Sequence, residues 1–193
     1  MTGPFAAGRF GYKPATVVEK LFAGDRRVLL FGQPGIGKTT LAAGLAAQLL
    51  ADRRHVWGLG ADPGSPVFGV PGAVCLGIWR EQGWSLRRMA GLCSLDAARF
   101  RLPLVSAVRA LAEEVSDGVL LLDAPGVCRG IAGAELLTSL VQAADIDLVL
   151  ALLRRDAPPL LADEMETLGV ELACIEASEK AHRPGGGELG HVG

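Results

Sequence analysis

The chain has 193 residues, enough for one α/β domain with a full hydrophobic core and too few for two ordinary domains. Half of the residues are apolar and 21% are charged, which excludes a disordered chain. The formal net charge of -2 excludes an overall positive field that would gather nucleic acid or an anionic membrane.

Residues 1–26 are expected to form an N-terminal arm followed by a short helix over Thr16–Phe22. The arm is rich in Gly, Pro and aromatic residues and has no apolar core of signal-peptide length. No apolar run approaches the roughly 18 residues that cross a membrane. We therefore expect no membrane association and a cytoplasmic location.

Strands alternate with helices over residues 27–177, the pattern of a mostly parallel sheet covered on both faces. Short apolar runs predict strands at Arg27–Phe31, His55–Gly60, Ala73–Leu76, Val119–Asp123, Asp145–Leu153 and Val170–Ile175. Other runs predict helices at Thr39–Ala51, Trp84–Leu95, Pro103–Val115, Ala134–Ala143 and Pro159–Leu168. The glycine-rich residues 178–193 are expected to be a flexible tail.

The segment Gly32–Thr39 reads GQPGIGKT and fits G-x-x-x-x-G-K-T without a mismatch, between a predicted strand and a predicted helix. Glycines let backbone N–H groups turn inward around a polyanion, and the helix start adds its positive dipole end. Lys38, expected to be an exposed loop residue, can reach the β- and γ-phosphates, and the Thr39 hydroxyl can ligate Mg²⁺. The pattern predicts an α/β, three-layer P-loop NTPase fold that binds ATP and Mg²⁺. The expected nucleotide-binding residues of this loop are Gly32, Gln33, Pro34, Gly35, Ile36, Gly37, Lys38, Thr39 and Thr40.

Asp62 ends the second predicted strand and is followed by Pro63 and Gly64. A carboxylate at the end of a neighbouring strand points at the same crevice as the phosphate loop. It could hold Mg²⁺ or accept a proton from an attacking hydroxyl. An Asp-Pro-Gly turn, in which the carboxylate only caps the bend, is an equally good interpretation of the spacing.

Asp123 closes the run VLLLD and is followed by Ala124, Pro125 and Gly126. This D-x-x-G resembles the γ-phosphate-sensing segment of P-loop GTPases, which makes Asp123 and Gly126 candidate nucleotide-binding residues; the alternative is an acid that caps the next loop. No N-K-x-D follows the next predicted strand, where residues 152–156 read LLRRD. We therefore expect ATP to bind at least as well as GTP.

Three blocks in this order resemble the P-loop domain of polynucleotide 5′-hydroxyl kinases of the Clp1/Grc3 type. After the phosphate loop, residues 62–66 (DPGSP) and 70–77 (VPGAVCLG) look like that family's D-x-G-Q-P and P-P-G-x-x-S-L. Residues 122–130 (LDAPGVCRG) then match its N-T-P-G-W-x-K-G in spacing. The resemblance implies that Lys38 and Thr39 bind the ATP phosphates and Mg²⁺. It also implies an acid role for Asp62 beside the acceptor and a basic residue, Arg129, near the transferred phosphate.

The departures from the family pattern bear on the acceptor. Ser65 stands in place of a glutamine, and Val127 in place of a tryptophan that could stack on the acceptor base, a main source of single-strand affinity. The leading hypothesis is transfer of the γ-phosphate of ATP to the 5′-hydroxyl end of RNA or DNA. The alternatives are a nucleotide-binding regulatory module that organises a protein partner or a missing flanking domain, and a plain ATPase or GTPase switch. The proposed catalytic residues are Lys38, Asp62 and Arg129, and the proposed metal ligands are Thr39 and Asp62.

Overall fold

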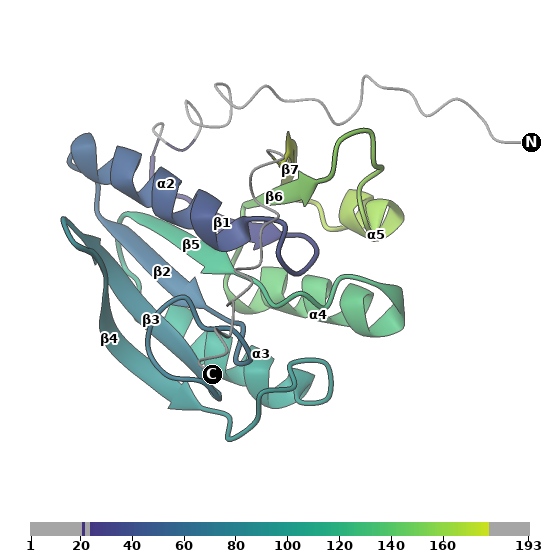
Figure 1. Ribbon diagram of the computed structural model, residues 1–193, viewed down its shortest axis with the longest axis horizontal. Helices are drawn as coiled ribbons and strands as arrows, with labels where there is room; N and C mark the ends of the chain where they lie inside the picture. The colour runs from purple at the N-terminus through teal and green to yellow at the C-terminus, as the bar shows by residue number, and fades with distance from the viewer. Residues whose placement is uncertain (1–20, 22–23, 178–193) are drawn as a thin grey trace, which may run out of the picture.

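The computed structural model describes residue 21 and residues 24–177, so most of the expected helix Thr16–Phe22 and the expected tail lie outside the described part. The described chain folds around one seven-stranded sheet with the order β4-β3-β2-β5-β1-β6-β7 (Figure 1). Its strands are β1 Arg27–Phe31, β2 Val56–Gly60, β3 Ala73–Arg80, β4 Gly83–Gly91, β5 Val119–Asp123, β6 Leu148–Leu153 and β7 Glu171–Glu176. Strands β2, β5, β1, β6 and β7 pair in parallel, while β3 and β4 are antiparallel additions at one edge.

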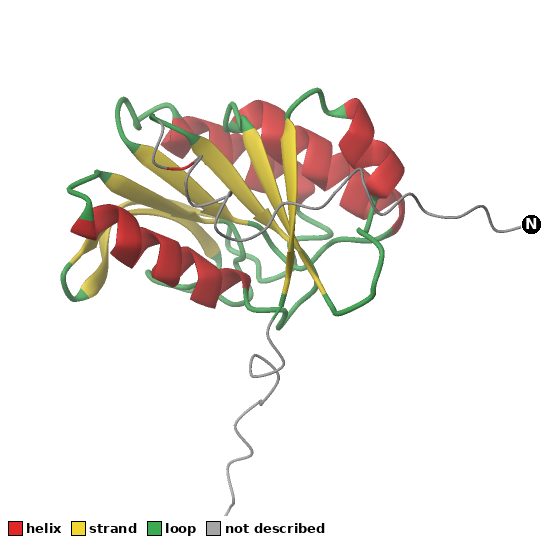
Figure 2. Cartoon of the chain, turned by 90° about the horizontal axis from the view of Figure 1, so that it is seen from above, coloured by secondary structure: helices red, strands yellow, loops and turns green. Residues whose placement is uncertain are grey.

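Helices cover both faces of this sheet, as Figure 2 shows in the view along its edge. They are α2 Lys38–Ala51, α3 Arg101–Ala112, α4 Gly130–Ala143 and α5 Ala162–Thr167. Alternate strand residues point to opposite faces. Leu121 and Leu150 accordingly join the core beneath α2, whereas Leu122 and Val149 join the larger core beneath α3 and α4. The predicted three-layer P-loop fold with a mostly parallel sheet is confirmed. None of the described helices has the length and apolar character needed to span a membrane.

The prediction of a helix over Trp84–Leu95 is wrong. This segment forms most of strand β4 and the start of the loop after it. Strand β3 runs on to Arg80, beyond the predicted end at Leu76, and turns back through Gly83, whose φ of +111° favours glycine. Most side chains of β4 are exposed because it is the edge strand, so its apolar residues do not alternate as in a half-buried strand. The weak period-two pattern explains the error.

Arg27, the first residue of β1, connects the ends of two helices that lie on the same face of the sheet. Its guanidinium donates hydrogen bonds to the carbonyl oxygens of Ala112 (3.3 Å), the last residue of α3, and of Val115 (2.8 Å), which follows the helix. It also donates to the carbonyl oxygen of Ala144 (3.0 Å), which follows α4. Cations are favourable at helix C-termini, where the dipole is negative.

We expect Arg27→Met to lower the free energy of unfolding by about 2–4 kcal/mol, because three carbonyl groups lose a charged donor. Urea denaturation measures the change. Arg109→Met is the matched control: Arg109 pairs with Glu113 one turn away on the exposed face of α3, and its loss should cost about 0.5 kcal/mol or less. Equal effects of the two substitutions would contradict a role for Arg27 in tying the helices together.

Candidate functional site

The phosphate loop lies where β1 ends and α2 begins, between Phe31 and Lys38. Gly35 and Gly37 have φ values of +70° and +101°, a region in which side chains are strained. A Cβ atom on Gly32 would come within 2.9 Å of the Leu152 carbonyl oxygen on β6. The loop can therefore curl tightly at the carboxyl edge of the sheet only with glycine at these positions.

A cavity of about 300 Å³ opens above this loop. Asp62 follows β2 and Asp123 ends β5, and these strands are neighbours, so both carboxylates reach the cavity. The residues that line it are Pro34, Gly35, Gly37, Lys38, Thr39, Thr40, Asp62, Ser65, Asp123 and Ala124. The structure thus brings together most of the candidate residues from the phosphate loop, from the end of β2 and from the end of β5.

Lys38 is not an exposed loop residue, as the sequence analysis expected, but is only 7% exposed. It is the first residue of α2, and its ammonium group folds back over the loop. There it donates to the carbonyl oxygens of Gly32 (3.0 Å) and Gln33 (3.2 Å). Burial lowers the pKa of Lys38, and the nearby carboxylates of Asp123 and Asp62 oppose this shift. The cation therefore sits inside the ring that would surround a phosphate chain.

Asp123 is 6% exposed and accepts a 2.7 Å hydrogen bond from the Thr39 hydroxyl through Oδ2. Its other oxygen, Oδ1, is buried and has no hydrogen-bond partner among the described residues. Burial raises the pKa of Asp123, against the effects of the Thr39 hydrogen bond and the Lys38 charge.

A threonine hydroxyl in contact with a carboxylate at the end of a neighbouring strand is the donor set that P-loop proteins use for Mg²⁺. Thr39, Asp62 and Asp123 therefore fit this ion. The sequence analysis had assigned the metal to Thr39 and Asp62, and the contact between Thr39 and Asp123 adds a third candidate ligand.

Asp62 both caps a turn and faces the phosphate cavity, the two interpretations that its sequence context left open. Its Oδ1 accepts hydrogen bonds from the backbone N–H groups of Gly64 (3.0 Å) and Ser65 (3.3 Å), which is the geometry of a capped turn. The same side chain lines the phosphate cavity. Turn capping occupies only Oδ1, so it does not prevent Oδ2 from meeting a metal or a proton.

Gly126 packs directly on the phosphate loop. A Cβ atom at this position would lie 2.4 Å from Cγ of Pro34, closer than real atoms approach. This contact is a structural reason for the glycine of D-x-x-G, independent of any contact with a γ-phosphate.

We expect Gly126→Ala to lower ATP affinity by about tenfold, because overpacking of this kind costs about 1–3 kcal/mol and must displace Pro34 or the loop that carries it. Isothermal titration calorimetry measures the loss. Gly44→Ala, at an exposed position of α2 with no atom within 4 Å of the added Cβ, is the control and should bind as the parent does. Unchanged affinity in the Gly126 variant would contradict the packing argument.

Arg129 is not brought into the cavity. It is exposed, precedes α4, and does not belong to the lining residues. Gln33 and Ile36 do not line the cavity either; the Gln33 carbonyl holds Lys38, and Ile36 is buried. Ser65 and Ala124 line it without having been proposed as binding residues. Each follows closely on an acid at the carboxyl end of a strand, and Ser65 also stands in place of the family's glutamine.

The family model of the mRNA cleavage and polyadenylation factor CLP1 P-loop matches residues 32–184. Among solved structures, a chain of the wild-type Clp1p–Pcf11p complex has 16% identity and a TM-score of 0.69 over 86% of this chain and 47% of that chain. A second structure concerns the extended interface between Pcf11p and Clp1p and ATP loss in a point mutant. It has 15% identity and a TM-score of 0.63 over 83% of this chain and 47% of that chain. The present chain spans about half the length of these solved chains, and no curated protein sequence matches it.

Proposed function

The chain belongs to the family of the CLP1 P-loop domain, and from this premise we propose that it binds ATP with Mg²⁺ and transfers the γ-phosphoryl group to the 5′-hydroxyl end of RNA or DNA. Family membership and the P-loop fold support nucleotide binding. The observation that carries the finer proposal is the position of Asp62, on the wall of the same cavity as Lys38 and Thr39.

In this proposal the triphosphate lies along Gly32–Thr40, with its β- and γ-phosphates beside Lys38. Bound Mg²⁺ would neutralise phosphate charge, held by Thr39 and Asp123, which leaves the free oxygen of Asp62 to the acceptor. The acceptor hydroxyl approaches from the side of Asp62; its oxygen bonds to the γ-phosphorus as the bond to the bridging oxygen breaks, and ADP leaves. Asp62 receives the hydroxyl proton through the oxygen that the turn does not use. Arg129 would meet the transferred phosphate by extending its long side chain from the start of α4.

The test offers ATP, Mg²⁺ and oligonucleotides with either a 5′-hydroxyl or a 5′-phosphate end, as RNA and as DNA. Mass spectrometry should find one added phosphate on the 5′-hydroxyl oligonucleotides and none on the 5′-phosphate controls. If no phosphate is added to the 5′-hydroxyl oligonucleotides, RNA or DNA, the proposal is contradicted.

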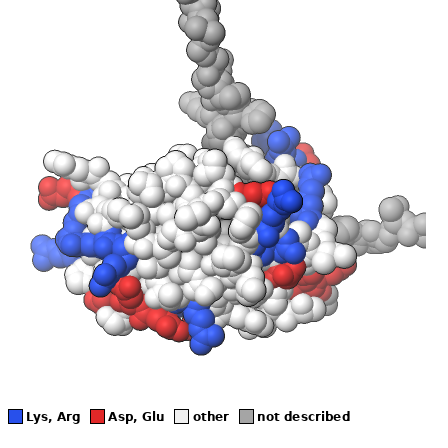
Figure 3. Space-filling model, turned by 90° about the horizontal axis from the view of Figure 1, so that it is seen from below, with Lys and Arg blue, Asp and Glu red and all other residues white. Residues whose placement is uncertain are grey.

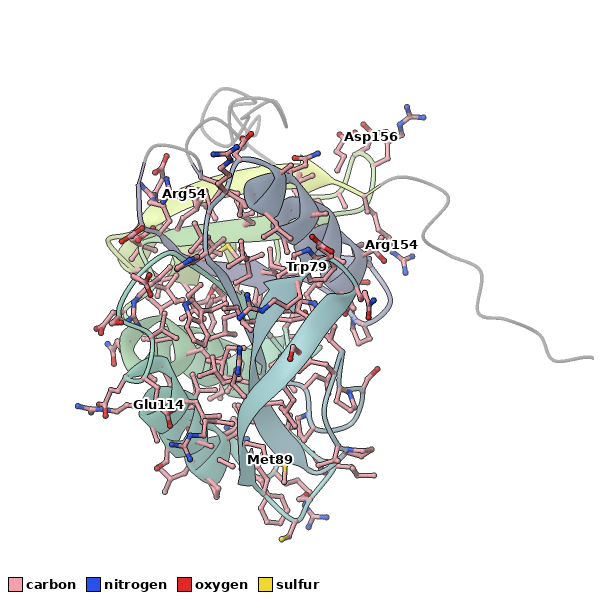
Figure 4. All side chains as sticks on the ribbon, turned by 90° about the vertical axis from the view of Figure 1, so that its left-hand side faces the viewer. Arg54, Trp79, Met89, Glu114, Arg154 and Asp156 are labelled. Atoms are coloured by element: carbon pink, nitrogen blue, oxygen red, sulfur yellow. The ribbon has the colours of Figure 1, made fainter. Side chains whose placement is uncertain are left out.

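We expect ATP to bind at least as well as GTP, because the segment after β6 lacks the residues that select guanine. Figure 4 shows Arg154 and Asp156 of this segment pointing away from the body of the molecule. A competition titration against a fluorescent adenine nucleotide measures the preference. GTP binding tighter than ATP by tenfold or more would contradict this expectation and favour the switch hypothesis.

The second candidate function is a nucleotide-binding module that organises a protein partner and catalyses little. Three observations favour it. Asp62 already serves the turn through Gly64 and Ser65, and the face seen in Figure 3 carries its charged side chains around the rim of a broad uncharged centre. Exposed Met89, Leu95 and Leu102 add apolar surface of the kind that protein partners cover.

A further inference from the structure

An aromatic side chain from the edge strand reaches toward the phosphate site. Trp84 of β4 extends across β3 and lies over Gly58 of β2, where a Cβ atom would come within 2.5 Å of its ring. Phe68 stacks on the Trp84 ring with centroids 5.4 Å apart, and Trp79 meets its edge at 4.8 Å. Figure 4 shows the hairpin that carries Trp79 and, further along β4, Met89. Only a glycine at position 58 leaves room for this indole.

A second, much smaller cavity lies between this aromatic cluster and the phosphate site. Its volume is about 10 Å³, and both Trp84 and Asp123 line it, with Phe68 and Gly60 among the other wall residues. A cavity of this size holds about one water molecule, provided that its walls offer polar partners.

Each of these two lining residues carries a buried polar atom without a partner. The indole Nε1 of Trp84 and the Oδ1 of Asp123 are both buried, and neither has a hydrogen-bond partner among the described residues. An indole N–H only donates, and a carboxylate oxygen only accepts. Buried polar atoms in native proteins are almost always satisfied, often by an internal water.

We propose that one buried water bridges the indole N–H of Trp84 to Oδ1 of Asp123. The Asp123 carboxylate is then held at both oxygens, by the water at Oδ1 and by the Thr39 hydroxyl at Oδ2. Trp84 is thereby a positioning residue for Asp123. It also anchors, through Phe68, the segment that carries Asp62 and Ser65, so one indole connects the two acidic walls of the phosphate cavity.

The direct test uses the indole NMR signals of the three tryptophans, Trp57, Trp79 and Trp84. We expect a nuclear Overhauser cross-peak between the Trp84 indole proton and water. In Asp123→Ala, the Trp84 signal should shift and its hydrogen exchange should accelerate. Trp57, whose Nε1 also lacks a partner but which does not line the cavity, is the internal control and should stay in place.

Asp96→Ala is the matched substitution, since Asp96 caps an exposed turn away from the cavity. If Asp123→Ala does not fold, Asp123→Asn replaces it and should shift the Trp84 signal in the same direction by a smaller amount. The inference is overturned if the Trp84 indole proton shows no water cross-peak. A Trp84 signal that moves no further than that of Trp57 when Asp123 is changed would also overturn it.

The functional consequence rests on the proposed nucleotide binding. In Trp84→Phe the ring that stacks on Phe68 remains but the donor is lost, and we expect the Mg²⁺ concentration needed for ATP binding to rise about tenfold to a hundredfold. Trp79→Phe, which removes a neighbouring indole outside the cavity, should leave the Mg²⁺ requirement unchanged. An unchanged requirement in Trp84→Phe would contradict the positioning role. A parent chain that binds no ATP would refute the proposed function while leaving the NMR result to decide on the water.

Discussion

Lys38→Ala is expected to lower ATP affinity by roughly a hundredfold or more while the fold remains intact. The lysine is the one cation of the described phosphate loop, and removing one partner of a buried charged contact costs about 2–5 kcal/mol of binding. Its burial is already unfavourable for the charge, as the lowered pKa of Lys38 indicates. Alanine removes the charge and the hydrogen bonds to the carbonyl oxygens of Gly32 and Gln33, but Lys38 belongs to neither hydrophobic core, so the fold should remain.

Calorimetry with ATP and Mg²⁺ measures the affinity, and a thermal melt should show a midpoint near that of the parent. Arg109→Ala, which removes a cation from the exposed face of α3, is the control and should bind ATP normally. Unchanged affinity in Lys38→Ala would show that the loop Gly32–Thr40 does not hold the phosphates.

Asp62→Asn is expected to lower the rate of phosphoryl transfer by about a hundredfold to ten-thousandfold, as loss of a general base typically does. ATP affinity should stay within a few-fold of the parent, because the charge acts mainly in the transition state. Thermal stability should be near normal, since an asparagine oxygen can still accept the N–H groups of Gly64 and Ser65.

Two further variants separate charge from turn geometry. Asp62→Ala should lose stability as well as activity, because it removes the capping oxygen. Asp96→Asn changes an exposed aspartate that caps the Arg99 N–H in a similar turn, and it should leave the rate unaffected. Full activity in Asp62→Asn would make Asp62 a turn residue and would move the acid role to Asp123.

The phosphate loop could be predicted from the sequence because its chemistry is local. The glycines, Lys38 and Thr39 must follow one another for the backbone to enclose a phosphate. The run VLLL before Asp123 is apolar throughout because both faces of β5 are covered. The alternation of strands and helices then specifies a layered sheet. The first and last residues of strands β1 and β5 are those that the sequence predicted.

Features that depend on strand order could not be predicted in the same way. Thr39 meets Asp123 because β5 lies between β1 and β2, and no local pattern states that order. The same strand order brings Asp123 and Asp62 to the cavity that Lys38 lines, where their charges oppose the lowering of its pKa by burial. Arg129 matches a family spacing, but it is exposed at the start of α4 and does not line the cavity.

The most direct test of the proposed function follows the label of γ-labelled ATP mixed with Mg²⁺, the parent chain and a 5′-hydroxyl oligonucleotide. We predict that the label moves to the oligonucleotide, that little appears as free phosphate, and that Lys38→Ala and Asp62→Asn both abolish the transfer. Label in free phosphate alone would identify an NTPase. ATP binding with no release of label at all would contradict phosphoryl transfer and identify a nucleotide-binding module.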